Sequence, residues 1–226
     1  MRKILASQIL VFIALFGVIV TCGVGTTGLL LGDLDLGDFR GVVLVLAGAI
    51  ISFAFAIGVF RLFLRVCPLR PGMIEPGSRQ EFVYHVYLLF FLIIFYPVMR
   101  SGAMPVPLMR LVYQGLGARL GENTYSSGIL LDPPFVQIGA NTLVGQYALL
   151  VPHVIENDRL AHYPIRIGDR VTIGAHAVVL PGVTIEDDAL VATGAIVKKG
   201  THIRAGEVWS GVPARCMRGP EAGTEI

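Results

Sequence analysis

Residues 165–203 read IRIGDRVTIGAHAVVLPGVTIEDDALVATGAIVKKGTHI. Within this stretch an aliphatic residue recurs at every sixth position without interruption. The series consists of Ile167, Ile173, Val179, Ile185, Val191, Val197 and Ile203. A shorter upstream series with the same spacing consists of Ile138, Val144 and Leu150. A six-residue period is typical of hexapeptide solenoids, in which each unit supplies one short strand and one turn.

This period excludes an α-helix for the repeat region. At 3.6 residues per turn, a six-residue spacing would spread the aliphatic side chains around a helix, whereas stacked coils align them in one column. Small residues at a second phase fit the tight inner corners of such coils. These are Val171, Ala177, Val183, Ala189 and Ala195. The sequence therefore predicts an all-β parallel β-helix.

The first hundred residues have a different character. A mean hydropathy of +0.70 with 15% charged residues is too apolar for an ordinary soluble protein. Uncharged runs cover residues 4–32 and 41–60, and each reaches the ~20 residues that a membrane-spanning helix needs. We expect a transmembrane helical hairpin within residues 1–66. A cleaved signal peptide is the alternative for the first run, although that run continues well past the lipoprotein-like Cys22.

The positions of the basic residues predict the orientation of this hairpin. Lys and Arg near the ends of membrane helices stay on the cytoplasmic side. They flank both ends of the hairpin, at Arg2, Lys3, Arg61, Arg65, Arg70 and Arg79. We therefore expect a multi-pass protein of the inner (cytoplasmic) membrane whose repeat domain is cytoplasmic.

Residues 67–120 form the expected connector between the two parts. Residues 67–77 are rich in Pro and Gly, which predicts an irregular surface segment. Residues 82–99 are apolar, but basic residues at both ends favour an interfacial or re-entrant segment over a third crossing. A third crossing would place the solenoid outside the cell.

The end of the connector has the pattern of an amphipathic helix. Between residues 107 and 120, Leu108, Leu111, Val112 and Leu116 share one face of a helix. We expect this helix to lie on the membrane and to cap the first coil of the solenoid.

The charge and the cysteines give no support for a nucleic-acid partner or for a cysteine-bound metal. A net charge of +2, with no basic run interleaved with aromatic residues, gives no support for a nucleic-acid partner. The three cysteines, Cys22, Cys67 and Cys216, lack metal-ligand spacing. They indicate a reducing compartment and no disulfide framework.

The six-residue phase breaks once, between Leu150 and Ile167, in the segment VPHVIENDRLAHYPIRIG at residues 151–168. An insertion in an otherwise regular coil is a usual place for function. His153 is suited to general base catalysis near neutral pH, and Glu156 would either orient its ring or only solubilise the loop. We expect His162 and His176 to be structural.

Two motifs carry a resemblance to a known family. They are IGDRVTIGAHAVVLPGVTIEDDALVATGAIVKKG at residues 167–200 and WSGVPAR at residues 209–215. Together they resemble the hexapeptide-repeat acyltransferases of the left-handed β-helix class, most of all the galactoside and maltose acetyltransferases. The helical part looks like the membrane-attached members found in exopolysaccharide and peptide-synthetase systems. The resemblance implies a left-handed parallel β-helix at residues 121–218, followed by a tail at residues 219–226.

The resemblance also implies a mechanism and an assembly. Members of this family are homotrimers with the active site in the cleft between two subunits. A histidine takes the proton from an acceptor hydroxyl or amine, which then attacks the thioester of acetyl-CoA, and His153 occupies the matching position. No metal is expected. The residues that would contact acetyl-CoA are Ala175, Thr193, Lys198, Lys199, Pro213 and Arg215.

Two departures from the family pattern leave the acceptor open. Thr172 stands where many relatives have tryptophan, and the excursion is shorter than in the sugar acetyltransferases. The expected acceptor is a membrane-associated glycan, lipid or peptide intermediate. Two other functions remain possible: a catalytically silent trimeric scaffold, and a γ-class carbonic anhydrase, which needs three histidines on zinc. His153, His162 and His176 do not show the histidine pairing of that enzyme.

Overall fold

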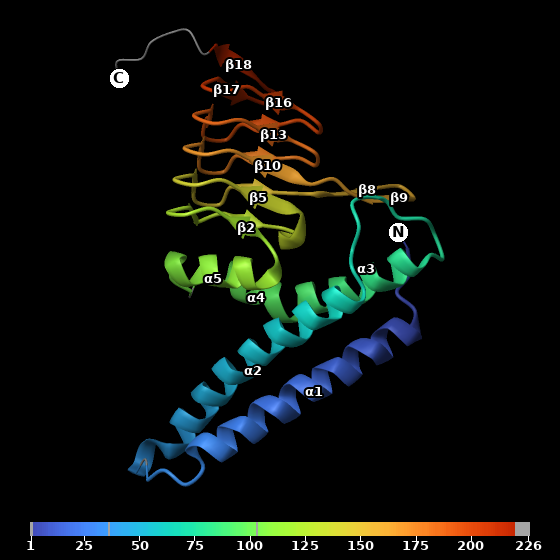
Figure 1. Cartoon of the computed structure of the whole chain (residues 1–226), viewed down its shortest axis with the longest axis vertical. Helices are drawn as coiled ribbons and strands as arrows, with labels where there is room; N and C mark the ends of the chain where they lie inside the picture. The colour runs from blue at the N-terminus through green and yellow to red at the C-terminus, as the bar shows by residue number, and fades with distance from the viewer. Residues whose placement is uncertain (1, 36, 103, 220–226) are drawn as a thin grey trace. The chain divides into compact units, whose positions relative to one another are not determined.

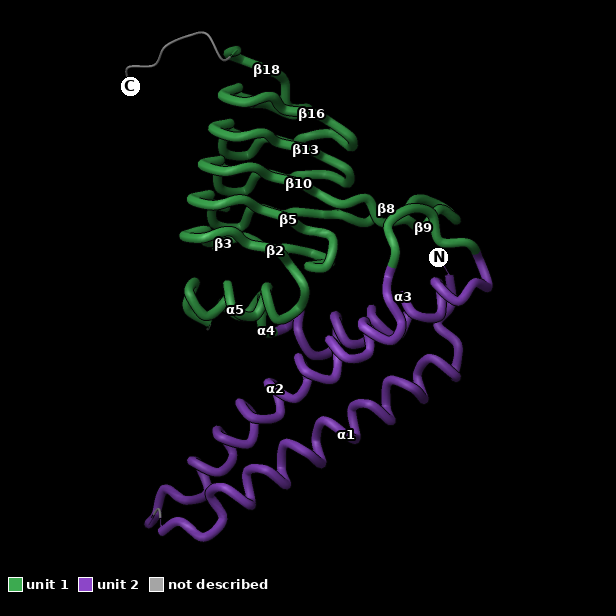
Figure 2. Tube along the Cα trace, viewed as in Figure 1, with its two compact units in different colours: residues 1, 70–75, 98–226 green, residues 2–69, 76–97 purple. Residues whose placement is uncertain are grey.

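The computed structural model describes residues 2–35, 37–102 and 104–219. The chain forms two compact units, coloured separately in Figure 2. The first contains Arg70–Glu75 and Val98–Ile226, and the second contains Arg2–Leu69 and Pro76–Pro97. Of the expected tail at residues 219–226, all but Gly219 lies outside the described residues.

The first unit is a parallel β-helix with three sheets, whose coils are stacked in Figure 1. We name them sheets I, II and III in the order in which the chain visits them. Sheet I contains β2 (Arg119–Leu120), β5 (Val136–Ile138), β10 (Ile165–Ile167), β13 (Thr184–Ile185) and β16 (His202–Ile203). Sheet II contains β3 (Tyr125–Ser126), β6 (Leu143–Val144), β11 (Thr172–Ile173), β14 (Leu190–Val191), β17 (Val208–Gly211) and the last strand, β18 (Ala214–Arg218), which is antiparallel to β17. Sheet III contains β4 (Ile129–Leu130), β7 (Leu149–Leu150), β12 (Val178–Val179) and β15 (Ile196–Val197).

The aliphatic column of the sequence forms the core of this coil. Ile167 lies opposite Ile185, and Ile173 lies opposite Val191, each 18 positions further along the chain. These side chains are buried, and each contributes roughly 1.5–3 kcal/mol by leaving water. The predicted hexapeptide solenoid is therefore confirmed.

The excursion between β7 and β10 is a β-hairpin. Its strands β8 (His153–Glu156) and β9 (Arg159–His162) are antiparallel. A third strand, β1 (Gly72–Met73), pairs with the free edge of β9, and the Ile74 amide donates to the Leu160 carbonyl at 2.8 Å. The segment expected to be irregular thus contains a strand, because the backbone groups at the edge of a hairpin need partners.

Helix α5 (Val106–Leu116) caps the first coil, as expected, with a buried face that shares Val112 and Leu116 with the predicted one. Its buried residues are Met109, Val112, Tyr113 and Leu116, whereas Leu108 and Leu111 are 51% and 62% exposed. The buried Tyr113 stabilises this orientation of the helix. Its hydroxyl donates to the Gly128 carbonyl at 2.9 Å and accepts from the Leu130 amide at 3.3 Å. Burial raises the pKa of Tyr113 to about 12, so the hydroxyl stays protonated and able to donate.

The second unit is helical. Helices α1 (Ala6–Leu31) and α2 (Arg40–Val66) are joined through the short 3-10 helix η1 (Gly37–Phe39). Helix α3 (Arg79–Phe90) continues through the π-helical turn η2 (Phe91–Phe95), and α4 (Tyr96–Arg100) follows. The ring of Phe60 on α2 contacts Phe95 edge to face, with centroids 5.1 Å apart.

Within the described part of the chain, three helical stretches are long and apolar enough to cross a membrane, judged by length and composition. They are Ala6–Leu31, Gly37–Val66 and Arg79–Arg100. The first two correspond to the hairpin that the sequence predicts. The third is a 22-residue helix where we expect an interfacial or re-entrant segment, and that expectation stays a prediction.

The Tyr113 hydroxyl gives a test of the cap. In Tyr113→Phe, the Gly128 carbonyl and the Leu130 amide lose a buried partner, so we expect a loss of about 1–3 kcal/mol in the free energy of unfolding. The measurement is denaturant unfolding followed by circular dichroism. The control is Tyr147→Phe at a 70% exposed ring, which should change stability by less than about 0.5 kcal/mol. Equal free energies of unfolding for the two variants would contradict the stabilising role of the Tyr113 hydroxyl in the cap.

Candidate active site

The candidate site begins at the first residue of the excursion hairpin. His153 opens β8, and its side chain is 26% exposed. Its Nδ1 lies 2.5 Å from the Oδ2 of Asp132. The carboxylate accepts this hydrogen bond, so we assign the proton to Nδ1 and leave Nε2 as the basic nitrogen.

Asp132 reaches His153 because the coil stacks their corners. Asp132 follows β4 and His153 follows β7, and these neighbouring strands of sheet III pair with Leu130 opposite Leu150. Asp132 is buried, has a left-handed backbone (φ 44°, ψ 63°) and precedes the short 3-10 helix η3 (Pro133–Phe135). Asp is one of the few residues besides glycine that visit this conformation, and the same left-handed backbone recurs at other positions of the coil.

The electrostatics of the pair follow from this contact. Burial lowers the pKa of His153, but the hydrogen bond and the negative charge of Asp132 together raise it by more. The pKa of His153 therefore lies above its ordinary value. A histidine in this setting is a stronger base once it is deprotonated, and its ring is held in one orientation.

His162 lies close to this pair, at the other end of the hairpin. It faces His153 across the hairpin, is fully buried and stacks on Phe135 with ring centroids 4.4 Å apart. Its Nε2 is 4.0 Å from Asp132 Oδ1. Burial lowers the pKa of His162 by more than Asp132 raises it, which favours a neutral ring. This setting is consistent with the structural role that we expect for His162.

The carboxylate on His153 is Asp132 rather than Glu156, which corrects one sequence expectation. Glu156 forms an ion pair with Lys199, and both side chains are exposed. It stands three residues along β8 from His153, which is about 10 Å and puts its side chain on the other face of the strand. Sequence reasoning missed Asp132, although an acidic residue before Pro-Pro one coil earlier was an available signal.

The residues expected to contact acetyl-CoA divide between two corners. The corner from sheet II to sheet III, named corner II–III, holds Ala175 and Thr193 in successive coils and Pro213 in the turn after β17. Arg215 follows on the exposed strand β18 (Ala214–Arg218). The next corner, from sheet III to sheet I, holds Lys198 and Lys199 together with the excursion that carries His153.

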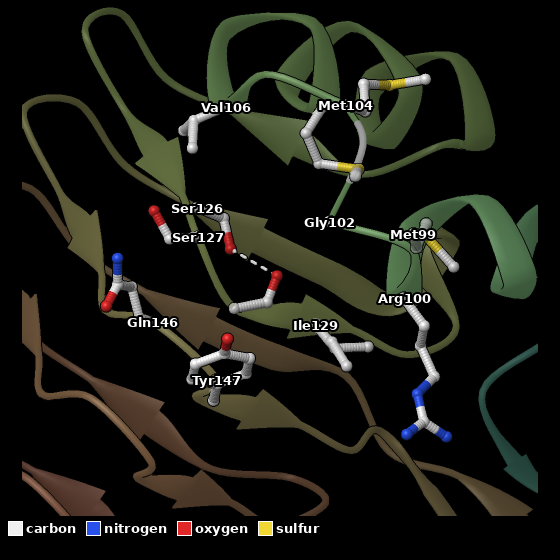
Figure 3. Close-up of a pocket in the computed structure, with 12 residues that line it drawn as sticks. Met99, Arg100, Gly102, Met104, Val106, Ser126, Ser127, Ile129, Gln146 and Tyr147 are labelled. Carbon is white, nitrogen blue, oxygen red and sulfur yellow. Dashed lines mark hydrogen bonds between the residues drawn. The ribbon is translucent and has the colours of Figure 1, made fainter.

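A pocket of about 310 Å³ opens at the first coil of corner II–III (Figure 3). Ser127, Gln146 and Tyr147 line it from the turns of the coil, and methionines line it from residues 99–109. The exposed ring of Tyr147 stacks on His176, with centroids 5.2 Å apart. His176 occupies a turn position, as the sequence predicts, and shares corner II–III with Ala175. Within the described residues, no group of three His, Cys, Asp or Glu side chains is placed to hold a metal ion.

Comparison with known proteins identifies the repeats. A family model described as "Hexapeptide repeat of succinyl-transferase" matches residues 164–199. Galactoside O-acetyltransferase of Escherichia coli (strain K12) is 36% identical over 113 residues, which are 46% of this chain and 55% of that protein. Gamma carbonic anhydrase 1, mitochondrial, of Arabidopsis thaliana is 36% identical over 106 residues, 38% of each chain. The chain spans about half the length, or less, of these curated relatives.

Solved structures give a similar set of proteins. A hexapeptide-repeat acetyltransferase of Vibrio cholerae, solved with acetyl coenzyme A, has a TM-score of 0.43 at 25% identity, covering 47% of this chain and 62% of that one. The left-handed β-helix is the form that hexapeptide repeats take, and the expected resemblance to hexapeptide-repeat acetyltransferases is confirmed. A place in the membrane-attached branch stays a prediction.

The contact between Asp132 and His153 predicts a measurable pKa change. In Asp132→Asn, the charge that raises the His153 pKa is lost while burial continues to lower it, so the pKa should fall toward or below the ordinary value. Imidazole resonances followed by NMR against pH measure this directly. In the matched control, Glu156→Gln, the His153 titration should be unchanged. A larger shift in the control than in Asp132→Asn would reverse the assignment.

Proposed function

We propose that this protein is a membrane-anchored acyltransferase that moves an acetyl group from acetyl-CoA to a hydroxyl or amine of a membrane-associated acceptor. The observation that carries the proposal is the buried Asp132 carboxylate on Nδ1 of a partly exposed His153. An oriented imidazole with its second nitrogen directed away from its carboxylate is suited to general base catalysis. The acetyltransferases among the relatives support the choice of reaction.

The proposed reaction needs one proton carrier. Nε2 of His153 accepts the acceptor's proton while the acceptor oxygen or nitrogen attacks the thioester carbonyl carbon. Asp132 stabilises the imidazolium that forms. The tetrahedral intermediate then expels the coenzyme A thiolate, which takes the proton from Nε2. The acetyl ester or amide, free coenzyme A and neutral His153 result.

The proposed coenzyme site follows corner II–III. Ala175 and Thr193 offer small side chains and backbone groups in successive coils, and Pro213 and Arg215 lie at the carboxyl-terminal end of this corner. The exposed side chains of Lys198 and Lys199 suit the phosphates of coenzyme A, which would compete with Glu156 for the ammonium group of Lys199. The residues proposed to contact coenzyme A thus lie at two different corners of one copy. In a homotrimer, as in the family, one corner of each site would come from one copy and the other corner from its neighbour.

The γ-class carbonic anhydrase is the second candidate, because two such enzymes are among the relatives. That chemistry needs zinc on three histidines. The histidines His153 and His162 both face Asp132, which binds one of them directly. Metal analysis of the purified protein separates the two candidates: stoichiometric zinc would favour the anhydrase.

The base assignment predicts a large kinetic effect. A positioned general base is typically worth ~10²- to 10⁴-fold, so His153→Ala should lower kcat by about this factor with little change in coenzyme A affinity. Thioester cleavage in the presence of acceptor measures the rate. In the wild type the rate should fall as the pH drops through the raised pKa of His153, because the protonated ring cannot accept a proton.

Two controls sharpen this experiment. Glu156→Gln should keep most of the wild-type rate, since its partner is Lys199. Co-assembly of His153→Ala with a second inactive variant, Thr193→Trp, should restore part of the activity if two copies share one site. Full activity of His153→Ala would contradict the assignment of His153 as the base. A monomer that is active on its own would contradict a site shared between two copies.

The anchor predicts a topology. A reporter fused after Ile226 should be cytoplasmic, and a reporter inserted at Asp35 should be external, because acetyl-CoA is a cytoplasmic donor and basic residues flank the hairpin ends. Paired enzymatic reporters, one active on each side of the membrane, measure this. An external carboxyl terminus would contradict the orientation and favour a crossing by Arg79–Arg100.

A further inference from the structure

The pocket at the first coil of corner II–III has two walls of different chemistry (Figure 3). One wall is largely apolar and comes from the segment just before α5 and its first turns, which also brings Arg100 to the pocket. The other wall is polar and comes from turns of the first two coils. The apolar side chains are Met99, Met104, Val106 and Met109, and the polar wall includes Ser127, Gln146 and Tyr147.

Tyr147 occupies a turn whose backbone conformation glycine adopts at a lower conformational energy. Its backbone is left-handed (φ 58°), and the equivalent turns of the next two coils hold His176 (φ 57°) and Gly194 (φ 71°). Left-handed backbone recurs at other corners of the coil, for example at Asn141, Arg170 and Asp188, so it does not by itself mark a site. The exposed, bulky side chain is what distinguishes Tyr147 from a small residue at such a corner. The ring of Tyr147 is 70% exposed at the edge of the pocket and rests on His176. A rigid, exposed aromatic face beside amide and hydroxyl groups suits a hydroxyl-bearing ring.

The opposite wall suits a hydrocarbon chain. Methionine side chains are flexible and polarisable, so they adapt to chains of different shape. The volume of about 310 Å³ lies at the small end of the range for ligand pockets, enough for one head group and the first part of a chain.

We propose that this pocket binds an amphiphile with a saccharide head group and an alkyl chain. The head lies against Tyr147, Gln146 and Ser127, and the chain lies against Met99 and Met104. The role of this amphiphile as the acyl acceptor rests on the proposed function. The pocket lies on the corner that carries Ala175 and Thr193, so a thioester directed down this corner would end beside it.

Direct binding of alkyl glucosides tests the pocket. The full chain in lipid nanodiscs is titrated with ethyl, butyl and hexyl glucoside and with free glucose, the alkyl glucosides being kept below their micellar concentrations. Empty nanodiscs correct for partitioning into lipid. Affinity should rise by up to about fourfold for each added methylene, the value for full burial of a CH₂ group.

Two variants test the polar wall and the apolar wall of the pocket separately. Tyr147→Ala should weaken binding of every probe by up to about tenfold, because the stacking surface for the head is lost. Met104→Gln should flatten the dependence on chain length and leave glucose binding unchanged. The matched control is Met217→Gln, at a 70% exposed methionine on β18, which should bind like the wild type.

These measurements test amphiphile binding in the pocket separately from the acetyl-transfer reaction. Affinity that is independent of chain length, or unchanged in Tyr147→Ala, would overturn the pocket even if acetyl transfer to some acceptor is observed. Binding that responds to Tyr147→Ala and to Met104→Gln as expected, and that persists in His153→Ala, supports the pocket. If that binding is found in a protein with no acetyl transfer, the pocket stands and the proposed function fails.

Discussion

The 18-residue register of the parallel coil is the constraint on which the other features of the first unit depend. Each turn must place one aliphatic side chain in the core column, or the backbone ladder and the hydrophobic contacts fail together. Gly174 illustrates how little freedom remains at the corners. A Cβ atom there would lie 2.4 Å from the Thr193 amide nitrogen of the next coil. With the strands fixed this closely, the chain can vary its chemistry only at exposed turns, at the coil ends and at an insertion.

The stacking of corners explains how Asp132 and His153 meet. They are 21 positions apart in the chain, yet they follow adjacent strands of sheet III. The excursion directs His153 outward, while the left-handed backbone at Asp132 directs a carboxylate beneath it. Burial alone would favour a neutral, weakly basic imidazole, but the carboxylate charge outweighs burial and raises the His153 pKa. The buried ring of His162 lies 4.0 Å from Asp132 and stacks on Phe135.

Corner II–III brings together features that are far apart in the sequence. The two-walled pocket lies at its first coil, Ala175 and Thr193 lie in the middle, and the turn with Pro213 closes it. On the proposed function, donor and acceptor would meet along this one edge. The base stands at the neighbouring corner, which is the physical reason to propose that two copies build each site. Strand β1, from the segment between α2 and α3, pairs with the hairpin that carries this base.

The sequence by itself determined the solenoid, its capping helix, the apolar helices and the excursion with His153, because each rests on a local period or an unbroken apolar run. It did not determine which carboxylate meets His153, which face of α5 is buried, or that residues 72–73 form a strand. These depend on contacts between positions far apart in the chain. Glu156 is near His153 in sequence but lies along an extended strand from it, whereas Asp132 is one coil away and in contact. Only the stacked register converts that distance in sequence into a hydrogen bond.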